Sequence, residues 1–364
     1  MATVFASGKP ARQMHLLLTE PGDEPLLTDE LKRMFVGAET ELVAPGLLRT
    51  EVAFQASTPP VLAFARQMLP DACGVGAVSI REWSERLFEV TSRLPEGQPW
   101  RLHLAPHYGG EGAGENRMRF IHDALRELLR KKRWHLLRKL EESEAPFRES
   151  TSLVQLLLTA PDAGFLSLAI APQPWQLRRC VWPFSKGEVP VGSDKTAPSR
   201  AFAKLLEAEQ RLGQRIGAGD TCVDLGACPG SWTYVAVNRG ARVISVDRSP
   251  LREDLMANPL VSFQQGDAFK FVPEVPVDWL LCDVIAAPER SIGLVLDWVR
   301  ERRCRQFIVT IKFKGQADYA KLEPLKHALP PLCKEFFLTR LCANKNEACV
   351  MGTLLDVPSP RPAT

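Results

Sequence analysis

The sequence predicts an α/β protein whose C-terminal half is an open sheet of strands alternating with helices, preceded by α+β structure. Three observations carry this prediction. A glycine-containing turn at 222–232 follows a short apolar strand and leads into a helix. Four further apolar segments downstream each end in a charged residue, and a basic helical stretch at 117–140 is followed by two strand-like segments. Helices and strands in this order are typical of layered α/β architecture.

The turn at 222–232 reads CVDLGACPGSW and predicts a nucleoside-binding loop. Because glycine has no Cβ, the backbone at Gly226 and Gly230 can come close to a ligand. The loop lacks the third glycine of the dinucleotide-binding pattern, which favours a cofactor without phosphates, and S-adenosylmethionine is the usual occupant. The alternative is a simple strand-to-helix connection. The candidate cofactor-binding residues in the loop are Asp224, Gly226, Cys228, Pro229, Gly230, Ser231 and Trp232.

Short apolar segments that end in a carboxylate or a lysine follow this loop. They are 242–247, 261–267, 277–283 and 306–312, and they end at Asp247, Asp267, Asp283 and Lys312. Ligands of open α/β sheets bind outside the carboxyl ends of the strands, so we expect these ends to meet at one crevice. Asp247 is expected to accept hydrogen bonds from ribose hydroxyls, and Asp267 from an adenine amino group. Each aspartate could instead be a helix N-cap or turn residue.

Length and composition bound the class of protein. The 364 residues suggest two or three domains, and nine cysteines without metal-ligand spacing predict reduced thiols and neither a metal site nor a disulfide framework. No apolar run is long enough for a signal segment or a membrane span, so we expect a soluble, cytoplasmic protein without a membrane partner. The net charge is only +3, so binding to nucleic acid has to come from a local patch.

The helical stretch at 117–140 supplies such a patch. Its basic residues surround Trp134 and His135, which could contact RNA phosphates and bases. The alternative is a solvated helix face on which the basic residues pair with Glu127, Glu141 and Glu142. Segments 153–159 and 165–170 are expected to be the strands of the same α+β module. The candidate RNA-binding residues are Arg126, Arg130, Lys131, Lys132 and Arg133.

The opening hundred residues predict another small α/β unit. A strand is expected at 15–18, a helix at 27–35 and a further apolar segment at 60–68. The glycine-rich stretch 109–114 predicts a loop. The expected division of the chain is 1–95, 96–185, a linker at 186–200, a cofactor-binding domain at 201–355 and a disordered tail at 356–364.

Residues 197–232, together with 242–247 and 277–283, resemble the bacterial 23S ribosomal RNA 2′-O-ribose cytidine methyltransferases, the RlmM family of the RrmJ/FtsJ-like group. The resemblance is specific across roughly 195–355 and weaker over 1–190. It implies a ferredoxin-like domain at 1–95, a THUMP-like RNA-binding domain at 96–185, and a Rossmann-like S-adenosylmethionine-dependent methyltransferase domain. The last domain is expected to include an antiparallel seventh strand at 348–355.

The resemblance also implies a catalytic tetrad of two lysines and two acids. A ribose 2′-hydroxyl is a poor nucleophile, so the enzyme has to orient it and remove its proton. Lys312 is the expected base, with Asp283 holding its amine and Lys204 and Glu347 positioning the ribose. A lysine serves as a base only when its ammonium form is discouraged, by desolvation or by a second cation. The implied tetrad is Lys204, Asp283, Lys312 and Glu347.

Two positions depart from the pattern of this family. Ser231 stands where a second glycine is common, and Ala201 stands where a serine is frequent. Ser231 retains its backbone N–H for a cofactor carboxylate, whereas Ala201 is left with backbone contacts alone. Cofactor affinity is therefore less firmly predicted than the fold.

Rival functions differ in the residues that they require near Asp283. An amino-group methyltransferase would need an Asn/Asp-Pro-Pro-aromatic run at 281–286, and a 5-methylcytosine enzyme would need a nucleophilic cysteine. Cys282 is expected to point away from Asp283 into the core because side chains alternate along a strand. The residues and the resemblance together predict an S-adenosylmethionine-dependent ribose 2′-O-methyltransferase, and the resemblance alone implies a cytidine in 23S ribosomal RNA as its target. We expect a monomer that acts on naked RNA or on an early assembly intermediate. Methylation of another RNA such as tRNA, and a non-catalytic assembly role, remain open.

Overall fold

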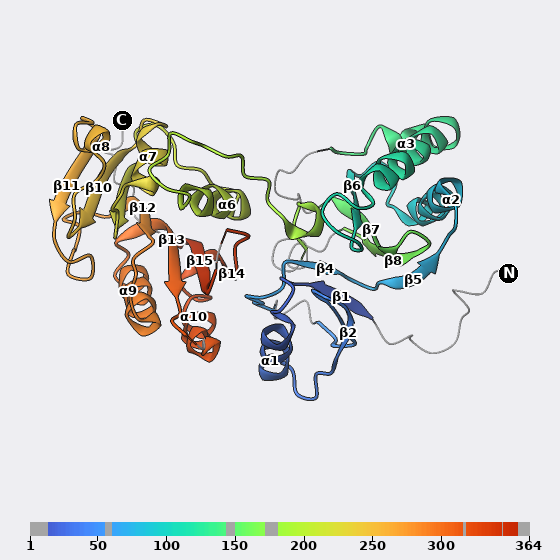
Figure 1. The fold of residues 1–364 in the computed structure, drawn as a ribbon, viewed down its shortest axis with the longest axis horizontal. Helices are drawn as coiled ribbons and strands as arrows, with labels where there is room; N and C mark the ends of the chain where they lie inside the picture. The colour runs from blue at the N-terminus through green and yellow to red at the C-terminus, as the bar shows by residue number, and fades with distance from the viewer. Residues whose placement is uncertain are drawn as a thin grey trace. The chain divides into compact units, whose positions relative to one another are not determined.

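The computed structural model describes residues 14–54, 60–142, 150–171, 181–315, 318–343 and 345–355. The chain forms two compact units, Met1–Glu188 and Val189–Thr364 (Figure 1). Their division falls inside the segment predicted as a linker, 186–200. The predicted tail at 356–364 lies outside the described residues. None of the described helices has both the length and the apolar character needed to cross a membrane.

The first unit begins with a four-stranded antiparallel sheet in the order β2-β3-β1-β4. The strand predicted at 15–18 is confirmed as β1. The helix expected at 27–35 begins earlier, where Pro25 lies in its first turn with a φ suited to helix entry. The elements are β1 (His15–Leu18), α1 (Glu24–Met34), β2 (Thr40–Ala44), β3 (Leu47–Thr50) and β4 (Gln67–Leu69).

A second four-stranded sheet, in the order β5-β8-β7-β6, completes this unit. One face is covered by helices whose buried side chains, including Trp83 and Ile121, pack on strand residues such as Leu156. The change from one sheet to the other lies between Leu69 and Cys73, earlier than the boundary predicted after residue 95, because β5 pairs with β8. The elements are β5 (Cys73–Gly76), α2 (Ile80–Val90), a 3-10 turn (Thr91–Arg93), β6 (Trp100–Pro106), α3 (Glu115–Lys132), α4 (Trp134–Leu137), β7 (Ser152–Ala160) and β8 (Ala163–Ala169).

The helical stretch predicted at 117–140 is broken at Arg133, whose backbone has φ −145° and ψ 54°. The side chain of Arg133 is held by α2: its guanidinium donates to the Phe88 carbonyl oxygen at 2.7 Å and to the Thr91 hydroxyl at 3.0 Å. The guanidinium also lies 4.0 Å from the centroid of the Phe88 ring. These contacts, which the hydrophobic pattern cannot reveal, fix the position of the break between α3 and α4.

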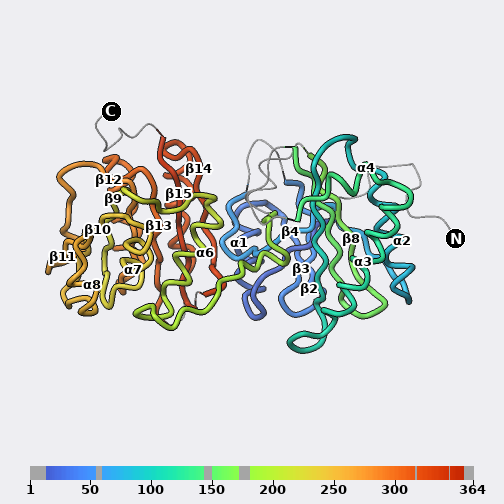
Figure 2. Tube along the Cα trace, turned by 90° about the horizontal axis from the view of Figure 1, so that it is seen from above, coloured from blue at the N-terminus to red at the C-terminus, as the bar shows by residue number. Residues whose placement is uncertain are grey.

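The second unit is a seven-stranded sheet in the order β11-β10-β9-β12-β13-β15-β14. Helices α6 and α7 lie on one face and α9 and α10 on the other (Figure 1), and Figure 2 shows β11 and β14 at opposite edges. Strands β9 to β13 pair in parallel, as the alternation of strands and helices predicts. The strands are β9 (Thr221–Leu225), β10 (Arg242–Asp247), β11 (Val261–Gln265), β12 (Val277–Cys282), β13 (Cys304–Lys312), β14 (Cys333–Thr339) and β15 (Glu347–Leu354). The helices are α6 (Phe202–Leu212), α7 (Ser231–Val237), α8 (Glu253–Met256), α9 (Pro288–Arg300) and α10 (Glu323–Ala328), with 3-10 turns at Ser185–Gly187 and Tyr319–Leu322.

Strand β15 runs antiparallel to both of its neighbours, β13 and β14. The antiparallel strand expected at 348–355 is therefore present and begins at Glu347. Its pairing with β13 sets Lys312 directly opposite Glu347. Residues opposite one another on antiparallel strands bring their side chains within contact distance. The sheet register thus brings a lysine and a glutamate together at the end of β13.

Candidate active site

A pocket of about 300 Å³ lies at the carboxyl ends of β9, β10, β12 and β13. It lies where open α/β sheets bind ligands. Most residues predicted from the loop at 222–232 line it, together with residues from the other strand ends. The lining residues are Ser199, Ala201, Asp224, Gly226, Ala227, Cys228, Pro229, Ser231, Trp232, Asp247, Asp283, Val284, Ile285 and Lys312.

The two glycines of the loop are required by its geometry. Gly226 has φ 75° and Gly230 has φ 107°, in the region that side chains with a Cβ rarely adopt. A Cβ on Gly226 would lie 2.9 Å from the Cα of Val284, and one on Gly230 would lie 2.4 Å from Leu255. Gly226 therefore lets the loop pack closely against the residues that follow β12. Two of these residues, Val284 and Ile285, line the pocket. The Cys228–Pro229 peptide bond is cis.

Asp224, on β9, fixes the loop at 222–232 by hydrogen bonds to the start of α7. One of its carboxylate oxygens, Oδ2, accepts hydrogen bonds from the Thr233 backbone N–H at 3.0 Å and from the Thr233 hydroxyl at 2.7 Å. Burial raises the pKa of Asp224 to about 7, against the opposing effect of Thr233. The sequence predicted a cofactor contact here, and the structure gives Asp224 an evident role in holding α7 against β9.

This pKa predicts that the protein loses stability as the pH rises from about 4 to about 7. Over that range the unfolded state releases the Asp224 proton while the folded state retains it, so stability falls with pH. Over the whole range between the unfolded and folded pKa values, the free energy of unfolding is expected to fall by about 4 kcal/mol. Asparagine cannot ionise. In Asp224→Asn, the free energies of unfolding measured in urea at pH 5 and pH 7 should therefore differ less than they do in the wild type. Equal pH dependence in variant and wild type would contradict the prediction.

The aspartates at the ends of β10 and β11 differ in their placement. Asp247 lines the pocket and accepts hydrogen bonds from the backbone N–H groups of Cys228 at 3.1 Å and Ser249 at 2.9 Å. Asp267 is not among the lining residues. The Phe269 backbone N–H, at 3.0 Å, and the Arg248 guanidinium, at 3.3 Å, engage its carboxylate and lower its pKa. The contact of Asp267 with an adenine amino group stays a prediction.

The two positions that depart from the family pattern, Ala201 and Ser231, lie in two segments that hydrogen-bond to each other. The Ser231 hydroxyl lies 2.7 Å from the hydroxyl of Ser199, a residue that the sequence did not single out. The backbone oxygen of Ala201 accepts a hydrogen bond from the Trp232 indole at 2.8 Å. The segment before α6 is thereby held against the start of α7. The contact that the structure gives the Ala201 backbone oxygen is thus to the protein itself, and a backbone contact of Ala201 with the cofactor stays a prediction.

The four residues of the predicted tetrad lie together. Lys312 Nζ is 3.0 Å from Asp283 Oδ1 and donates to the Asp283 carbonyl oxygen at 2.6 Å. Lys204 Nζ, reaching in from α6, is 3.4 Å from the same Oδ1 and 2.5 Å from Glu347 Oε1. The two lysines thus share one carboxylate. Charge-assisted contacts of this kind fix side-chain positions more firmly than contacts between neutral groups do.

The two lysines differ in their surroundings. Burial lowers the pKa of Lys204, but the negative charges of Asp283 and Glu347 more than offset burial and raise it above the ordinary lysine value. Lys204 therefore remains an ammonium at neutral pH and is unsuited to accept a proton. Only Lys312 of this pair lines the pocket.

Two neighbours of Asp283 complete the picture. The buried hydroxyl of Thr310 donates to Asp283 Oδ1, a contact that the sequence analysis missed. Its signal was the alternation of β13, which puts Thr310 and Lys312 on one face. Cys282 is fully buried, and burial raises its pKa to about 12. A thiol with that pKa supplies almost no thiolate at neutral pH, so Cys282 is unsuited to be a nucleophile.

The predicted RNA-binding residues lie on α3 and at its end, in the first unit. Arg126 pairs with Glu142, while Arg130 and Lys131 both pair with Glu127, at 2.7 and 2.9 Å. Lys132 is exposed, and the next residue, Arg133, is anchored to α2 as described above. Trp134 is 55% exposed. The helix thus has features of a solvated face, in its ion pairs, and of an RNA-binding patch, in its exposed aromatic ring.

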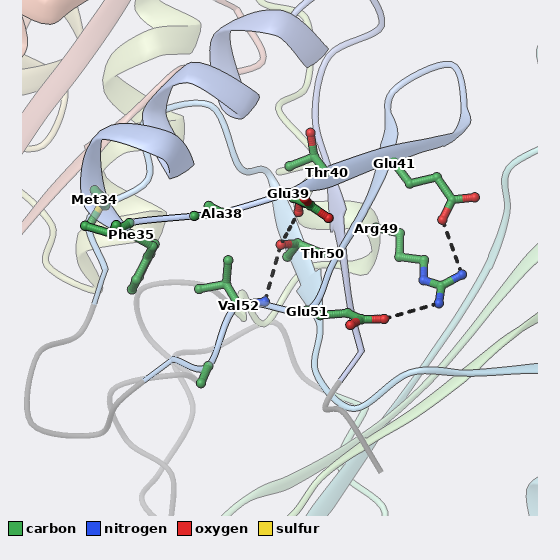
Figure 3. Close-up of a pocket in the computed structure, with 13 residues that line it drawn as sticks. Met34, Phe35, Ala38, Glu39, Thr40, Glu41, Arg49, Thr50, Glu51 and Val52 are labelled. Atoms are coloured by element: carbon green, nitrogen blue, oxygen red, sulfur yellow. Dashed lines mark hydrogen bonds and ion pairs between the residues drawn. The ribbon is translucent and has the colours of Figure 1, made fainter.

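The first unit also contains a wider hollow, of about 770 Å³, lined by residues 34–41 and 49–53 (Figure 3). Its charged groups engage each other: Arg49 lies 3.3 Å from Glu41 and 3.5 Å from Glu51. The Thr50 hydroxyl donates to the Glu39 carbonyl oxygen at 2.9 Å. Arg49, Glu41, Glu51 and the Thr50 hydroxyl are therefore engaged within the protein, and the sequence pattern pointed to none of these contacts.

Comparison with known proteins finds similarity to methyltransferases in the second unit. Residues 197–350 match the FtsJ-like methyltransferase family. The chain is 36% identical over 202 residues to "Ribosomal RNA large subunit methyltransferase M" of Thauera aminoaromatica, covering 54% of this chain and 51% of that protein. The protein of the same name from Pseudomonas putida (strain W619) is 35% identical over 195 residues, covering 52% and 54%. The chain spans about half the length of these curated relatives, and its residues 197–350 are similar to the FtsJ-like methyltransferase family.

Proposed function

We propose that this chain is an S-adenosylmethionine-dependent RNA methyltransferase that methylates the 2′-oxygen of a cytidine ribose in 23S ribosomal RNA. The observation that carries the proposal is the cluster of Lys204, Asp283, Lys312 and Glu347 beside a nucleoside-sized pocket. The FtsJ-like domain and the names of the relatives support the RNA substrate. The substrate is naked RNA or an early assembly intermediate, methylated in the cytoplasm by a monomer.

The residues of the pocket suit S-adenosylmethionine. Its volume, about 300 Å³, is at the lower end of the range for small-molecule sites. Two carboxylates, Asp247 and Asp283, line it beside Asp224, whose pKa is raised to about 7, and Lys312 is the one basic residue among the described residues that line it. This charge pattern favours a cofactor with hydroxyls and positive groups and disfavours one with phosphates. The cofactor supplies a methyl group that its sulfonium has already activated.

The protein has to orient the ribose and take up the proton of its 2′-hydroxyl. Lys312 Nζ is the proposed acceptor, because it reaches the pocket and Asp283 fixes its position. Lys204 retains its proton, as its raised pKa indicates, and provides a fixed positive charge. Glu347, paired with Lys204 at 2.5 Å, is proposed to position the ribose together with Lys204.

The experiment that tests this function is transfer of a tritiated methyl group to ribosomal RNA from a strain lacking the gene, followed by nucleoside analysis. The expected product is 2′-O-methylcytidine from the large-subunit RNA. A base-methylated product would contradict the roles given to the two lysines. Cofactor binding without transfer to naked RNA or to assembly intermediates would instead favour a binding role, and transfer to tRNA alone would replace the proposed substrate.

The proposed RNA-binding surface on α3 gives a further prediction. Replacing Arg130, Lys131 and Lys132 together with glutamine should weaken RNA binding. Loss of three phosphate contacts should reduce the slope of log K against log salt by about 2 for single-stranded RNA. The measurement is a salt titration of RNA affinity. Arg133 is left intact because it holds α2.

The matched control for this variant is Arg81→Gln. Arg81 is an exposed arginine on α2, already paired with Glu85 at 2.8 Å. It should leave both the affinity and its salt slope at the wild-type values. If the triple variant behaved like this control, α3 would be an ordinary solvated helix face.

A further inference from the structure

Thr310 is a buried residue that lies at the reaction centre without belonging to the tetrad. It is two positions before Lys312 on β13, so both side chains are on the same face of the sheet. Its exposed fraction is 0%, and its hydroxyl donates to Asp283 Oδ1. A buried hydroxyl needs a hydrogen-bond partner. Here that partner is the carboxylate that the two lysines share.

The sheet itself brings this donor to Asp283. Strands β12 and β13 are parallel neighbours, and Cys282 is in register with Val309. The residues that follow each of these, Asp283 and Thr310, therefore lie side by side. The Cys282 carbonyl oxygen is a second acceptor for the hydroxyl, at 3.5 Å. That is at the long limit for a hydrogen bond between a hydroxyl and an oxygen, so the carboxylate is the better partner.

Thr310 differs from the other groups that bind this oxygen. Lys312 and Lys204 reach Oδ1 at 3.0 and 3.4 Å through long, flexible side chains. Thr310 is β-branched, with restricted rotation about χ1, and lies in the middle of a paired strand. The hydrogen bond from its hydroxyl to Asp283 therefore does not depend on the positions of the two lysine side chains. When Lys312 turns toward a substrate hydroxyl, Thr310 keeps the carboxylate in place.

We propose that Thr310 is a positioning residue for methyl transfer: its hydroxyl fixes the Asp283 carboxylate, which in turn fixes Lys312 Nζ at the pocket. This inference rests on the proposed function, because it assigns Thr310 to the same reaction. It adds a fifth side chain to the reaction centre. That side chain acts through Asp283 and does not touch the substrate.

The test compares Thr310→Val with Thr310→Ser in the methyl-transfer assay. Valine has nearly the shape of threonine and no hydroxyl, and it fits a buried strand position. Loss of a hydrogen bond to a charged group predicts a fall in kcat of about 10- to 100-fold. The KM for S-adenosylmethionine should stay near the wild-type value. Serine keeps the hydroxyl, so Thr310→Ser should retain most of the wild-type kcat.

Thr353→Val is the matched control, because the Thr353 hydroxyl on β15 has no hydrogen-bond partner among the described residues. It should leave kcat unchanged. A wild-type kcat for Thr310→Val, or an equal loss in Thr310→Ser, would overturn the inference and leave the proposed function intact. An inactive wild-type protein would overturn both. If Thr310→Val does not fold, Thr310→Ala provides the hydroxyl-free variant to set against Thr310→Ser.

Discussion

Lys312→Ala is expected to abolish methyl transfer while S-adenosylmethionine still binds. The Nζ atom of Lys312 contacts the side chain and the carbonyl oxygen of Asp283, at 3.0 and 2.6 Å, and it reaches the pocket from the end of β13. Loss of a general base costs about 10²- to 10⁴-fold in rate. Lys204 cannot replace it, because the raised pKa of Lys204 keeps it protonated.

The measurement is single-turnover methyl transfer, with cofactor affinity determined separately by calorimetry. Lys314→Ala is the control, since Lys314 is an exposed lysine two residues further along and outside the pocket lining. Lys314→Ala should retain the wild-type rate. A wild-type rate for Lys312→Ala would remove Lys312 from the role of base. A large loss of cofactor binding in Lys312→Ala would make it a binding residue.

Gly226→Ala is expected to displace the cofactor loop. The added Cβ would lie 2.9 Å from the Cα of Val284, a backbone atom that cannot turn aside, and φ at this position is 75°. A residue other than glycine in such a conformation costs about 1 to 3 kcal/mol. If this free energy destabilises the cofactor-binding conformation of the loop at 222–232, it lowers cofactor affinity by about tenfold or more.

The affinity of Gly226→Ala for S-adenosylmethionine and its unfolding free energy are the quantities to measure. Gly293→Ala is the control: Gly293 lies inside α9, and its added Cβ would meet no heavy atom within 4 Å. Alanine in a helix is more favourable than glycine by up to about 1 kcal/mol. Gly293→Ala should therefore be as stable as the wild type or more so. Unchanged affinity in Gly226→Ala would show that the loop tolerates a side chain.

The sequence predicts the cofactor-binding unit better than the rest of the chain. Apolar segments that end in a charged residue predict both strand positions and the edge where the pocket lies, and 242–247 coincides with β10. Strands β2 to β6 were not predicted, and neither was β14. Short strands of this kind are defined by pairing with distant partners, such as β5 with β8. A pattern local to one segment cannot show such pairing.

The site shows the same limit at the level of side chains. The carboxyl ends of β10 and β11 look alike in sequence, yet Asp247 lines the pocket while Asp267 is engaged by Arg248 at 3.3 Å. Arg133 looks like its basic neighbours, yet α2 holds it in place. In each case a partner from another part of the chain decides the role of the residue. The tetrad could be named only through a family resemblance, because its members are spread from 204 to 347.

The antiparallel pairing of β13 with β15 has an evolutionary consequence. Lys312 and Glu347 lie opposite each other through backbone hydrogen bonds between the strands, and the chain between them contains α10 and then β14, the edge strand that pairs with β15. The part of this segment that precedes β14 can change in length and composition while β13 and β15 keep their alignment. Changes there therefore leave the alignment of Lys312 with Glu347 intact. A single-residue slip of β15, by contrast, would turn Glu347 to the other side of the sheet.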